Sequence, residues 1–423
     1  KARPSFRHYR NDGPLLDPYR TRLQLRLPSY LQVCPSSETR PKSSLGVLSG
    51  YRSGVPDFLN DAQRDIQQRA DSLGRRVAAL DTDALEAHQI ERETRALSKR
   101  AGIFFLTQPT EFGGTDATCL ELTIAREALG SYGVDHLPGL FGPTPGLLAQ
   151  ASEHVRNKFL KPYLAGEMKG GFGFTEPSDA ERHTCAQYDG DGLLINGQKS
   201  YVTGGSHADF INTLVELEDV GPAMVLIETN SPGVQIIRRF GSIDGSHHAS
   251  FSFTDVRVPT EHIIGDAGSG MTRALDQVNA VRMAIAANCA GLCGFVCDQV
   301  ADHLDRTTSS TTAGSHQAVR VQFGKMRADA YAARSAVYRT ARLVDHGDNA
   351  VNEVMASKTL ATEALSSLVD LAIQIIGGES LVDSHPLASV FRRARATRLA
   401  EGSTEVLHGN IARGYLDLHL GRI

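Results

Sequence analysis

The spacing of apolar residues changes twice along this chain. Between residues 55 and 169 apolar side chains recur at helical spacing, as Ala70 and Leu73 do. Over 170–266 the spacing falls to every second residue, which is typical of strands, and over 267–423 the helical spacing returns. This order predicts an α+β protein with a helical N-terminal domain, a small β middle domain and a C-terminal helical bundle.

The two outer regions predict several helices each. Beyond a first helix that contains Ala70, the N-terminal region predicts helices at about 83–101, 119–129, 143–151 and 152–164. The C-terminal region predicts four longer helices, at roughly 270–304, 316–345, 350–376 and 404–416. Helices of such length favour an antiparallel four-helix bundle.

The middle region predicts short strands joined by glycine-rich turns. The strands are expected at 172–175, 193–195, 210–216, 223–229, 234–238 and 250–256. Asn196 followed by Gly197 is a strong signal of a two-residue hairpin turn, so we expect a hairpin between 193–195 and 200–203. Several short strands of this kind favour a small β-barrel or sandwich.

Residues 1–54 differ from the rest of the chain in charge. They contain ten lysines and arginines against three aspartates and glutamates, a net charge of +7. Because the whole chain carries −4, the remainder carries −11. The segment is rich in proline and lacks periodicity, which predicts an extended basic arm, and it shows no hydrophobic region of a signal peptide.

Composition excludes several functional classes. Of the 423 residues, 41% are hydrophobic and 22% are charged, as is ordinary for globular proteins. The acidic net charge does not favour nucleic-acid binding, and we expect no apolar run of the length of a membrane span. We therefore expect a cytoplasmic protein, or one of an organelle matrix if the host is eukaryotic.

Three cysteines recur every four residues. Cys289, Cys293 and Cys297 would form one stripe on a helix. Such a stripe fits a metal or redox site, or small residues at a close contact between helices. A tetrahedral metal site would need a fourth ligand from elsewhere. We therefore favour the helix contact and predict no metal site.

An acidic residue near the C-terminus stands directly before a sharp corner. Glu401 precedes Gly402, Ser403 and Thr404, and the last predicted helix begins there. A glycine in this place lets another molecule approach the main chain closely. The plainer interpretation is a helix N-cap at Ser403 or Thr404 with acidic residues in the first turn.

Six short motifs follow one another in a defined order. They are Glu111-Phe112-Gly113-Gly114, Phe174-Thr175-Glu176-Pro177, Asn196-Gly197-Gln198-Lys199-Ser200-Tyr201-Val202-Thr203, Phe253-Thr254-Asp255-Val256-Arg257-Val258-Pro259, Gln374-Ile375-Ile376-Gly377-Gly378, and Glu401-Gly402-Ser403-Thr404-Glu405. In this order and near this spacing they resemble the acyl-CoA dehydrogenase family, over about residues 57 to 420. The resemblance implies FAD held between the β domain and the C-terminal bundle.

The resemblance also implies the reaction, the α,β-dehydrogenation of an acyl thioester. Glu401 occupies the position of the family's base, which takes the α proton while the flavin N5 accepts the β hydride. The N–H of Gly402 would bind the thioester carbonyl and stabilise the developing enolate. Glu405 is the alternative base by residue type, but the resemblance places it, with Ser403, beside the cofactor.

Five residues of the middle region match the family's contacts to the flavin ring. Phe172, Phe174 and Thr175 would line the ring, and Tyr201 and Thr203 would lie over its other side. Neutral hydroxyls suit hydrogen bonding to the isoalloxazine. The alternative is that Thr175 and Thr203 are ordinary strand threonines.

Residues of the C-terminal region match the family's contacts to the other half of FAD, which is implied to cross a dimer interface. Gln317, Gln374, Gly377 and Gly378 match positions for the adenosine half, and the glycines also fit a helix C-cap. Arg306 matches the family's pyrophosphate-binding arginine, whose forked guanidinium suits a diphosphate.

The substrate side departs from the family pattern. Arg282 stands where the family carries a substrate-side arginine, with a solvated or ion-paired arginine as the alternative. The loop that begins at Ser178, a candidate substrate contact, is a few residues shorter than is usual. Ser309 and Ser310 replace a usual Phe-Gly pair. The acyl group and its carrier, CoA or an acyl carrier protein, therefore stay open.

The resemblance implies partners as well as a reaction. These are the acyl thioester, an electron-transfer flavoprotein or another electron acceptor, and further copies of the chain in a homodimer or homotetramer. A flavin-dependent oxidase or monooxygenase on the same fold is an alternative, although that branch usually lacks the base at the position of Glu401. A non-catalytic, nucleic-acid-associated relative would need a basic groove, which the acidic charge after residue 54 does not favour. We therefore expect a dehydrogenase.

Overall fold

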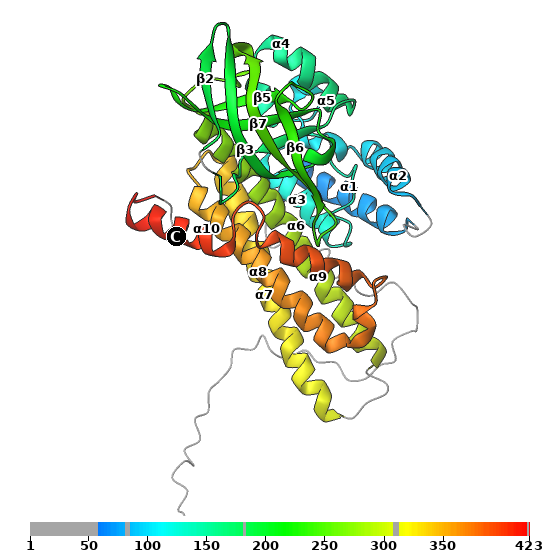
Figure 1. Cartoon of the computed structure of the whole chain (residues 1–423). Coiled ribbons are helices and arrows are strands. Elements are labelled where there is room, and N and C mark those ends of the chain that lie inside the picture. The colour runs from blue at the N-terminus through cyan, green and yellow to red at the C-terminus, as the bar shows by residue number, and fades with distance from the viewer. Residues whose placement is uncertain (1–57, 81–84, 181–182, 308–312, 421–422) are drawn as a thin grey trace, which may run out of the picture. The chain divides into compact units, whose positions relative to one another are not determined.

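The protein is described by a computed structural model that covers residues 58–80, 85–180, 183–307, 313–420 and 423. Within this part of the chain, helices come before and after one curled sheet, as the sequence predicts (Figure 1). The basic arm predicted for residues 1–54 and the pair Ser309 and Ser310 lie outside the described residues.

Helices form the N-terminal part. They are α1 (Asp61–Ala78), α2 (Ala87–Ala101), α3 (Cys119–Gly130), α4 (Glu153–Val155) and α5 (Lys161–Ala165). A π-helical turn joins α4 directly to α5. α1, α2 and α3 each begin with a capping box, in which the N-cap side chain and the third helical residue exchange hydrogen bonds.

The helix predicted at 143–151 is wrong. The structure has only a short 3₁₀ turn there, Gly146–Gln150. Pro143 and Pro145 lack the N–H groups that a helix needs, and Gly146 has a left-handed φ of +49°. The segment between α3 and this turn is therefore irregular, and it forms part of the wall of a cavity described below.

The middle region folds into one sheet, which has seven strands among the described residues. The strands are β1 (Gly170–Gly173), β2 (Cys185–Asp189), β3 (Gly192–Thr203), β4 (Phe210–Leu217), β5 (Gly221–Glu228), β6 (Val234–Gly241) and β7 (His247–Pro259). Their order is β1-β4-β2-β3-β7-β6, with β5 also paired to β4. β1 and β2 run parallel to β4, and the other pairs are antiparallel.

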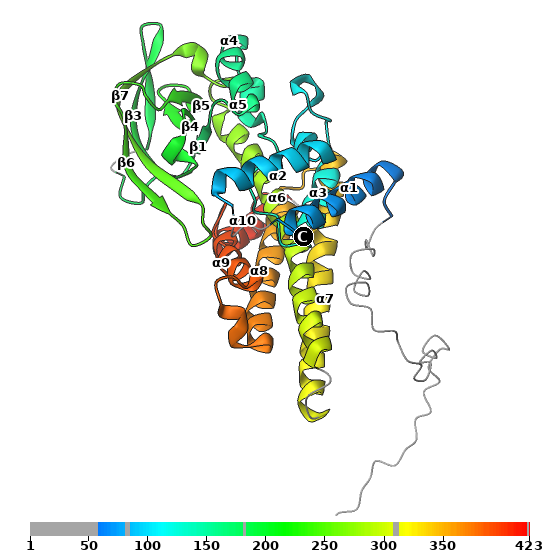
Figure 2. The same ribbon diagram turned by 90° about the vertical axis from the view of Figure 1, so that its right-hand side faces the viewer.

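The sheet curls so that its two halves enclose an apolar core. Ile211 of β4 and Val225 of β5 pack in one cluster with Val202 of β3 and Phe251 of β7. Figure 2 shows β3, β6 and β7 on the outer side and β1, β4 and β5 nearer to α5 and α6. The sandwich-like arrangement predicted from the short strands is therefore present.

The hairpin predicted at Asn196 and Gly197 is wrong, because β3 runs straight through both residues. Opposite the pair, β7 contains one extra residue, a β-bulge, and the Asn196 side chain exchanges hydrogen bonds with Asp255 of that bulge. Gly197 has a φ of +141°, and a Cβ there would lie 2.5 Å from the Cα of Thr184. The glycine is needed for the close approach of this neighbouring segment. The hairpin turn of this region lies instead at Gly190, where it connects β2 to β3.

The C-terminal part is helical. Its helices are α6 (Gly270–Thr307), α7 (Ala313–Asp345), α8 (Val351–Ile376), α9 (Pro386–Thr397) and α10 (Thr404–Leu416). The four predicted helices correspond to α6, α7, α8 and α10. α9 was not predicted, because its many arginines obscure the apolar periodicity of a helix. It begins with Pro386, and a proline is tolerated in the first turn of a helix.

The cysteine stripe of α6 lies in the core between helices. Cys289, Cys293 and Cys297 belong to the same apolar cluster as residues of α1, α3, α7 and α8. A Cβ on Gly291 would lie 2.9 Å from the Cα of Gly130, so α3 and α6 approach closely here. Burial raises the pKa of the Cys289 thiol to about 12. The stripe is therefore part of the close helix contact that the sequence favoured.

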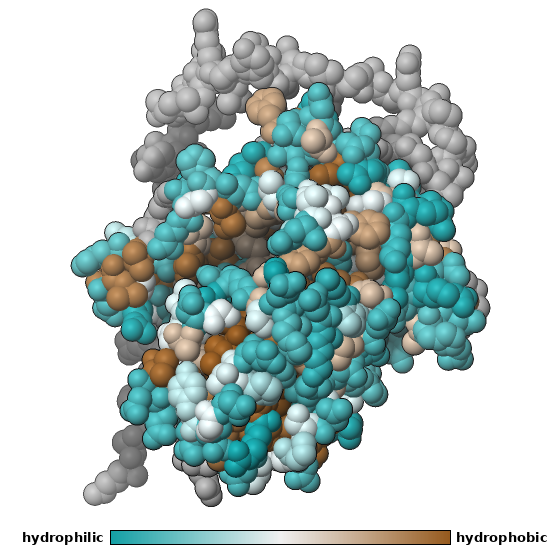
Figure 3. Space-filling model, turned by 90° about the horizontal axis from the view of Figure 1, so that it is seen from above, coloured by the Kyte–Doolittle hydropathy of each residue, from teal (hydrophilic) through white to brown (hydrophobic). Residues whose placement is uncertain are grey.

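Two helices, α6 and α8, are long and apolar enough to cross a membrane by length and composition alone. The expectation that no run reaches this length is corrected accordingly. In α6, 72% of the most apolar window is buried inside the protein, which is also a property of core helices. Figure 3 shows a largely hydrophilic surface on the upper face, with apolar groups gathered in separate patches.

Candidate active site

The corner at Glu401 connects α9 to α10 through an unusual backbone. Glu401 has a left-handed φ of +55°, and Gly402 follows at +104°. Ser403 is the N-cap of α10, because its hydroxyl accepts a hydrogen bond from the N–H of Val406 at 3.3 Å. Both interpretations of the corner are thus present together, with the helix cap at Ser403 and the carboxylate just before it.

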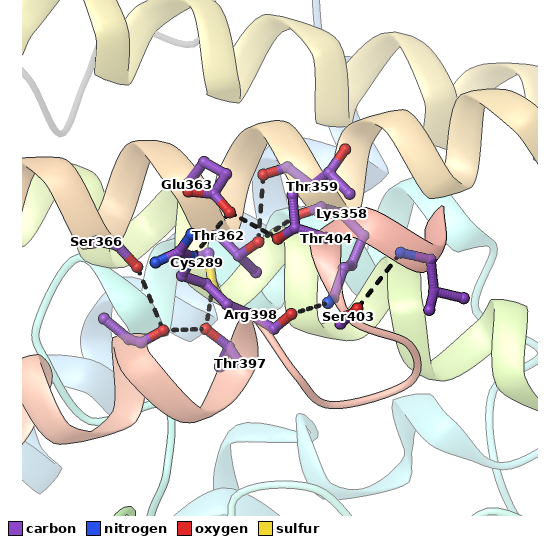
Figure 4. A network of polar contacts seen from close by, with 12 residues as sticks. Cys289, Lys358, Thr359, Thr362, Glu363, Ser366, Thr397, Arg398, Ser403 and Thr404 are labelled. Carbon is purple, nitrogen blue, oxygen red and sulfur yellow. Dashed lines mark hydrogen bonds and ion pairs between the residues drawn. The ribbon is translucent and has the colours of Figure 1, made fainter. Parts of the chain in front are cut away.

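Two buried cations hold this corner by its carbonyl groups. Arg282 of α6, which is only 8% exposed, donates from Nε to the carbonyl of Glu401 at 2.9 Å. Lys358 of α8, fully buried, donates from Nζ to the carbonyl of Gly402 at 2.9 Å and to that of Arg398 at 3.4 Å. Figure 4 shows the contact with Arg398. Arg282 is therefore neither solvated nor ion-paired among the described residues.

The electrostatics of the corner favour a strong base. Burial raises the pKa of the Glu401 carboxyl, and the positive charges of Arg282 and Lys358 only partly oppose this. Burial, together with the nearby charge of Arg282, lowers the pKa of Lys358 to about 8, although Cys289, Glu401 and Glu363 oppose the shift. Glu401 makes no ion pair within the part of the chain that the structure describes, so its carboxylate is free to act.

A second layer of polar contacts fixes the ends of α9 and α10 to α8. Glu363 of α8 accepts from Arg398 Nε at 2.7 Å and from the Thr404 hydroxyl at 2.6 Å (Figure 4). Because these partners lie on either side of Glu401, one carboxylate joins both ends of the corner to the same helix.

The predicted flavin contacts of the middle region lie on β1, on the segment that follows it, and on β3. Phe172 of β1 and Phe174 just after it stack with ring centroids 5.9 Å apart. The side chains of Tyr201 and Thr203 are exposed on one side of β3, with the buried Val202 between them. Tyr201 has a φ of +54°, at a register shift between β3 and β7.

A buried ion pair joins these strands and was missed in the sequence. Lys199 of β3, 1% exposed in its side chain, donates to Glu176 at 2.8 Å and to the carbonyl of Phe174 at 3.3 Å. The N–H of Ser200 donates to the carbonyl of Thr175 at 2.8 Å. These contacts hold the segment from Phe174 to Glu176 against β3. Glu176 and Lys199 each belong to one of the quoted motifs, and this was the only sign in the sequence of an interaction between the two residues.

The other predicted cofactor residues lie far from these strands. Arg306 is at the end of α6, Gln317 is in the first turns of α7, and Gln374 is near the end of α8, all three exposed. Gly377 has a φ of +88°, and a Cβ on it or on Gly378 would meet no atom within 4 Å. The sheet instead packs at the start of α6. One chain therefore does not bring the flavin contacts of the middle region together with the cofactor residues of the C-terminal helices.

Two further predicted residues lie on the surface. Glu405 is exposed in the first turn of α10, and hydrogen bonds to its backbone and to Ser403 lower its pKa. Its environment is therefore that of a weaker base than Glu401. Ser178 is exposed in the loop after β1.

The structure contains a cavity of about 520 Å³ that neither Glu401 nor Gly402 lines. α3, the first turns of α6 and the connection from α7 to α8 form its walls. Asn279 of α6 lines it and accepts a hydrogen bond from Arg282 Nη1 at 2.9 Å. Since Arg282 also donates to the backbone carbonyl of Glu401, two successive hydrogen bonds link the cavity wall to the main chain of the candidate base.

The comparisons with known proteins agree with this geometry. Models of the N-terminal, middle and C-terminal domains of acyl-CoA dehydrogenases match residues 60–167, 171–256 and 268–416. The chain belongs to the acyl-CoA dehydrogenase family, whose members are FAD-dependent oxidoreductases, and FAD is its cofactor.

The chain is similar to proteins of bacteria and of humans. A probable acyl-CoA dehydrogenase of Bacillus subtilis, YngJ, is 28% identical over 74% of this chain and 87% of its own length. The mitochondrial short-chain specific acyl-CoA dehydrogenase of Homo sapiens is 27% identical over 74% of this chain and 81% of its own length. The crystal structure of a probable acyl-CoA dehydrogenase from Mycobacterium abscessus is 26% identical, with a TM-score of 0.72 over 84% of this chain and 98% of that one.

The predicted cofactor residues of the middle region and those of the C-terminal helices both fit FAD. Exposed aromatic and hydroxyl side chains at Tyr201 and Thr203 suit the faces and edges of an isoalloxazine. The open space above Gly377 and Gly378 lets a phosphate or ribose approach the backbone, and the exposed Arg306 suits a diphosphate.

Proposed function

We propose that this protein dehydrogenates an acyl thioester between its α and β carbons, with Glu401 as the base that takes the α proton. FAD, when bound, supplies the acceptor of the β hydride. The N–H of Gly402 binds the thioester carbonyl and stabilises the negative charge that develops there. Ser178 and Arg282 are proposed as contacts to the thioester, and an electron-transfer flavoprotein or another acceptor takes the electrons.

The observation that carries this proposal is the way the corner is held. Both cations bind backbone carbonyls, which leaves the Glu401 carboxylate without an ion pair among the described residues, and burial raises its pKa. The N–H of Gly402 also makes no hydrogen bond within the described part of the chain, so it is available as a donor. Gly402 has a φ of +104°, a conformation that strains any residue with a side chain, so glycine is favoured here.

We also propose that each FAD is bound by two copies of the chain. The 37 residues from Gly270 to Arg306 span about 54 Å at 1.5 Å per residue. The sheet packs at one end of this helix, where a Cβ on Gly270 would lie 2.6 Å from Ala223 of β5. FAD is too short to reach from the flavin contacts at this end to Arg306 of the same chain. A homodimer or homotetramer would bring in Arg306 from a second copy.

The substitution Glu401→Gln tests the reaction. It keeps the size of the side chain but removes the base, and general-base contributions are typically about 10² to 10⁴-fold in rate. We expect the variant to keep its FAD and to bind thioester, while thioester-dependent bleaching of the flavin slows by at least about 100-fold. Anaerobic stopped-flow absorbance measures this rate. Bleaching at the wild-type rate would place the base elsewhere, and oxygen consumption without any bleaching by thioesters would favour an oxidase or monooxygenase.

A further inference from the structure

A histidine on β7 lies beside Thr203, the proposed flavin contact of β3. β7 pairs with β3 on one side and with β6 on the other (Figure 1). His248 is directly opposite Thr203 of β3 and Phe240 of β6, so these three side chains share one face of the sheet. The exposed Thr203 is at one end of this row, and the half-buried His248 is in the middle.

The ring of His248 is held in one orientation. Its Nδ1 lies 3.3 Å from Thr203 Oγ1, and its Nε2 lies 2.9 Å from Ser246 Oγ, in the turn between β6 and β7. Its face stacks on the Phe240 ring with centroids 5.5 Å apart, and Tyr201 packs edge-on with centroids 6.2 Å apart. Because both nitrogens have protein partners and the ring is packed, the direction of each hydrogen bond follows from the chemistry of the partners.

An aspartate at the far end of these contacts fixes that direction. Ser246 Oγ donates to Asp244 Oδ1 at 2.7 Å, and the N–H of Ser246 donates to the same oxygen at 3.1 Å. Burial alone would raise the pKa of Asp244, but hydrogen bonds from Ser246 and Ser242 lower it, so the ionised carboxylate can only accept. The single hydroxyl proton of Ser246 is thus used, and its oxygen must accept the Nε2–H of His248.

The same reasoning gives the direction of the hydrogen bond between His248 and Thr203. A neutral imidazole carries one N–H, so with its proton on Nε2 the Nδ1 of His248 is an acceptor. Thr203 Oγ1 then donates to Nδ1, because the hydroxyl holds the only proton between the two atoms. Thr203 therefore presents an oxygen lone pair, and not a hydroxyl proton, to the exposed side of β3.

We infer that His248 is a positioning residue that makes Thr203 a hydrogen-bond acceptor towards the flavin and thereby favours reduced FAD over oxidised FAD. The inference rests on the proposed function, because that function puts Thr203 beside the isoalloxazine. Reduction turns the ring nitrogen N5 from an acceptor into an N–H donor. An acceptor on Thr203 suits the N–H of reduced FAD, whereas a free hydroxyl could also donate to oxidised FAD. The reduction of FAD by a thioester becomes more favourable in consequence.

The test measures the reduction equilibrium of the FAD-loaded full chain against a dye of known potential. It is run at pH 8, where an ordinary imidazole is neutral. His248→Phe keeps a ring on Phe240 but frees the Thr203 hydroxyl to donate. We expect the ratio of reduced to oxidised FAD to fall by about 3- to 10-fold at the same dye ratio, which is the effect of one hydrogen bond. His248→Asn, which keeps an acceptor close to the place of Nδ1, should retain part of the wild-type ratio.

A second background separates positioning from a general effect on folding. Thr203→Val keeps the shape of the side chain without the hydroxyl, so adding His248→Phe to it should leave the ratio unchanged. Ser246→Ala leaves His248 in place but no longer fixes its proton on Nε2, so the ratio should fall by less than in His248→Phe. The control is His247→Phe, the same change at an exposed neighbour on the opposite face of β7, and it should match the wild type.

Three results would overturn the inference. They are equal ratios in the wild type and His248→Phe, a full shift that persists in the Thr203→Val background, and a ratio that stays constant or rises in Ser246→Ala. The last measurement decides the question even where His248→Phe fails to retain FAD. Thioester-dependent bleaching is recorded separately on the wild type. If the ratio falls as expected in the variants while no thioester bleaches the wild-type flavin, the proposed reaction fails and the role of His248 stands.

Discussion

Glu401 combines a strained backbone with an unpaired carboxylate, and its neighbours explain both. A left-handed φ on a residue other than glycine costs on the order of 1–3 kcal/mol, and it persists where surrounding contacts over-determine it. Here hydrogen bonds from Arg282 and Lys358 to main-chain carbonyls provide those contacts. Because the cations are used by the backbone, the carboxylate remains available for proton transfer.

Lys358→Met should weaken the corner and change the acidity of Glu401. Two carbonyls lose their buried donor, which should lower the free energy of unfolding by about 1–3 kcal/mol at neutral pH. The charge of Lys358 lowers the pKa of Glu401, so its removal should raise that pKa. The pH profile of flavin reduction should therefore shift to higher pH in the variant, as stopped-flow absorbance would show.

The stability difference caused by Lys358→Met should itself depend on pH. Lys358 titrates at about 8 in the folded chain and at its ordinary value of 10.5 in the unfolded chain, so the unfolded chain binds more protons between these values. The wild type should gain stability relative to the variant as pH rises from about 8 to about 10.5. Urea unfolding measures this, with Lys325→Met, an exposed lysine of α7, as the control. A difference that stayed constant across this range would contradict the burial of a charged Lys358.

The pairing of the segment after β1 with β3 depends on one buried ion pair. Burial alone would raise the pKa of Glu176, but hydrogen bonds from Lys199, Thr184 and His183 lower it to about 2. Glu176→Gln leaves Lys199 buried without its acid and should cost about 3 kcal/mol near neutral pH. Since Phe174 and Thr175 lie in this segment, FAD content should fall as well, as absorbance of the purified variant would report.

The difference in the free energy of unfolding between the wild type and Glu176→Gln should depend on pH in a known direction. The pKa of Glu176 is lowered on folding, so its contribution to stability is present above about 4.5 and is lost as pH falls towards about 2. The wild type and the variant should therefore converge in acid, as measured by urea unfolding. Glu167→Gln, an exposed change just before β1, should match the wild type throughout. A constant gap between wild type and Glu176→Gln would mean that the ion pair is not what holds this segment.

At the scale of the whole molecule, the separation of the two groups of cofactor residues predicts an obligatory assembly. Light scattering of the FAD-loaded protein should show a dimer or a tetramer and no monomer. Arg306→Glu and Thr203→Asp should each lose FAD, because they damage opposite ends of the proposed site. Co-expression of the two variants should restore FAD to one of the two sites in each mixed dimer. Failure of the mixed protein to bind any FAD, or an FAD-saturated monomer, would mean that one chain forms the site alone.

Local pattern was enough to predict the order of helices and strands. The long helices α6, α7 and α8 lie within a few residues of the predicted ranges, because their apolar periodicity is read over neighbouring turns. The motif around Glu401 likewise placed a carboxylate directly before the cap of α10. Where local signals competed, prediction failed. Asn196 and Gly197 fit a hairpin turn as well as a continuous strand opposite a bulge, and only the packing of Thr184 against Gly197 decides between them.

The tertiary structure alone decided which polar residues are buried and with whom. Lys358 and Gly402 are 44 residues apart, and Lys199 and Glu176 are 23 apart, so no window of sequence contains their contacts. In the sequence each lysine is indistinguishable from a solvated one, since burial depends on which segments the fold brings over it. Sequence determined the elements and the family, whereas the pairing of charges was determined by contacts between distant segments.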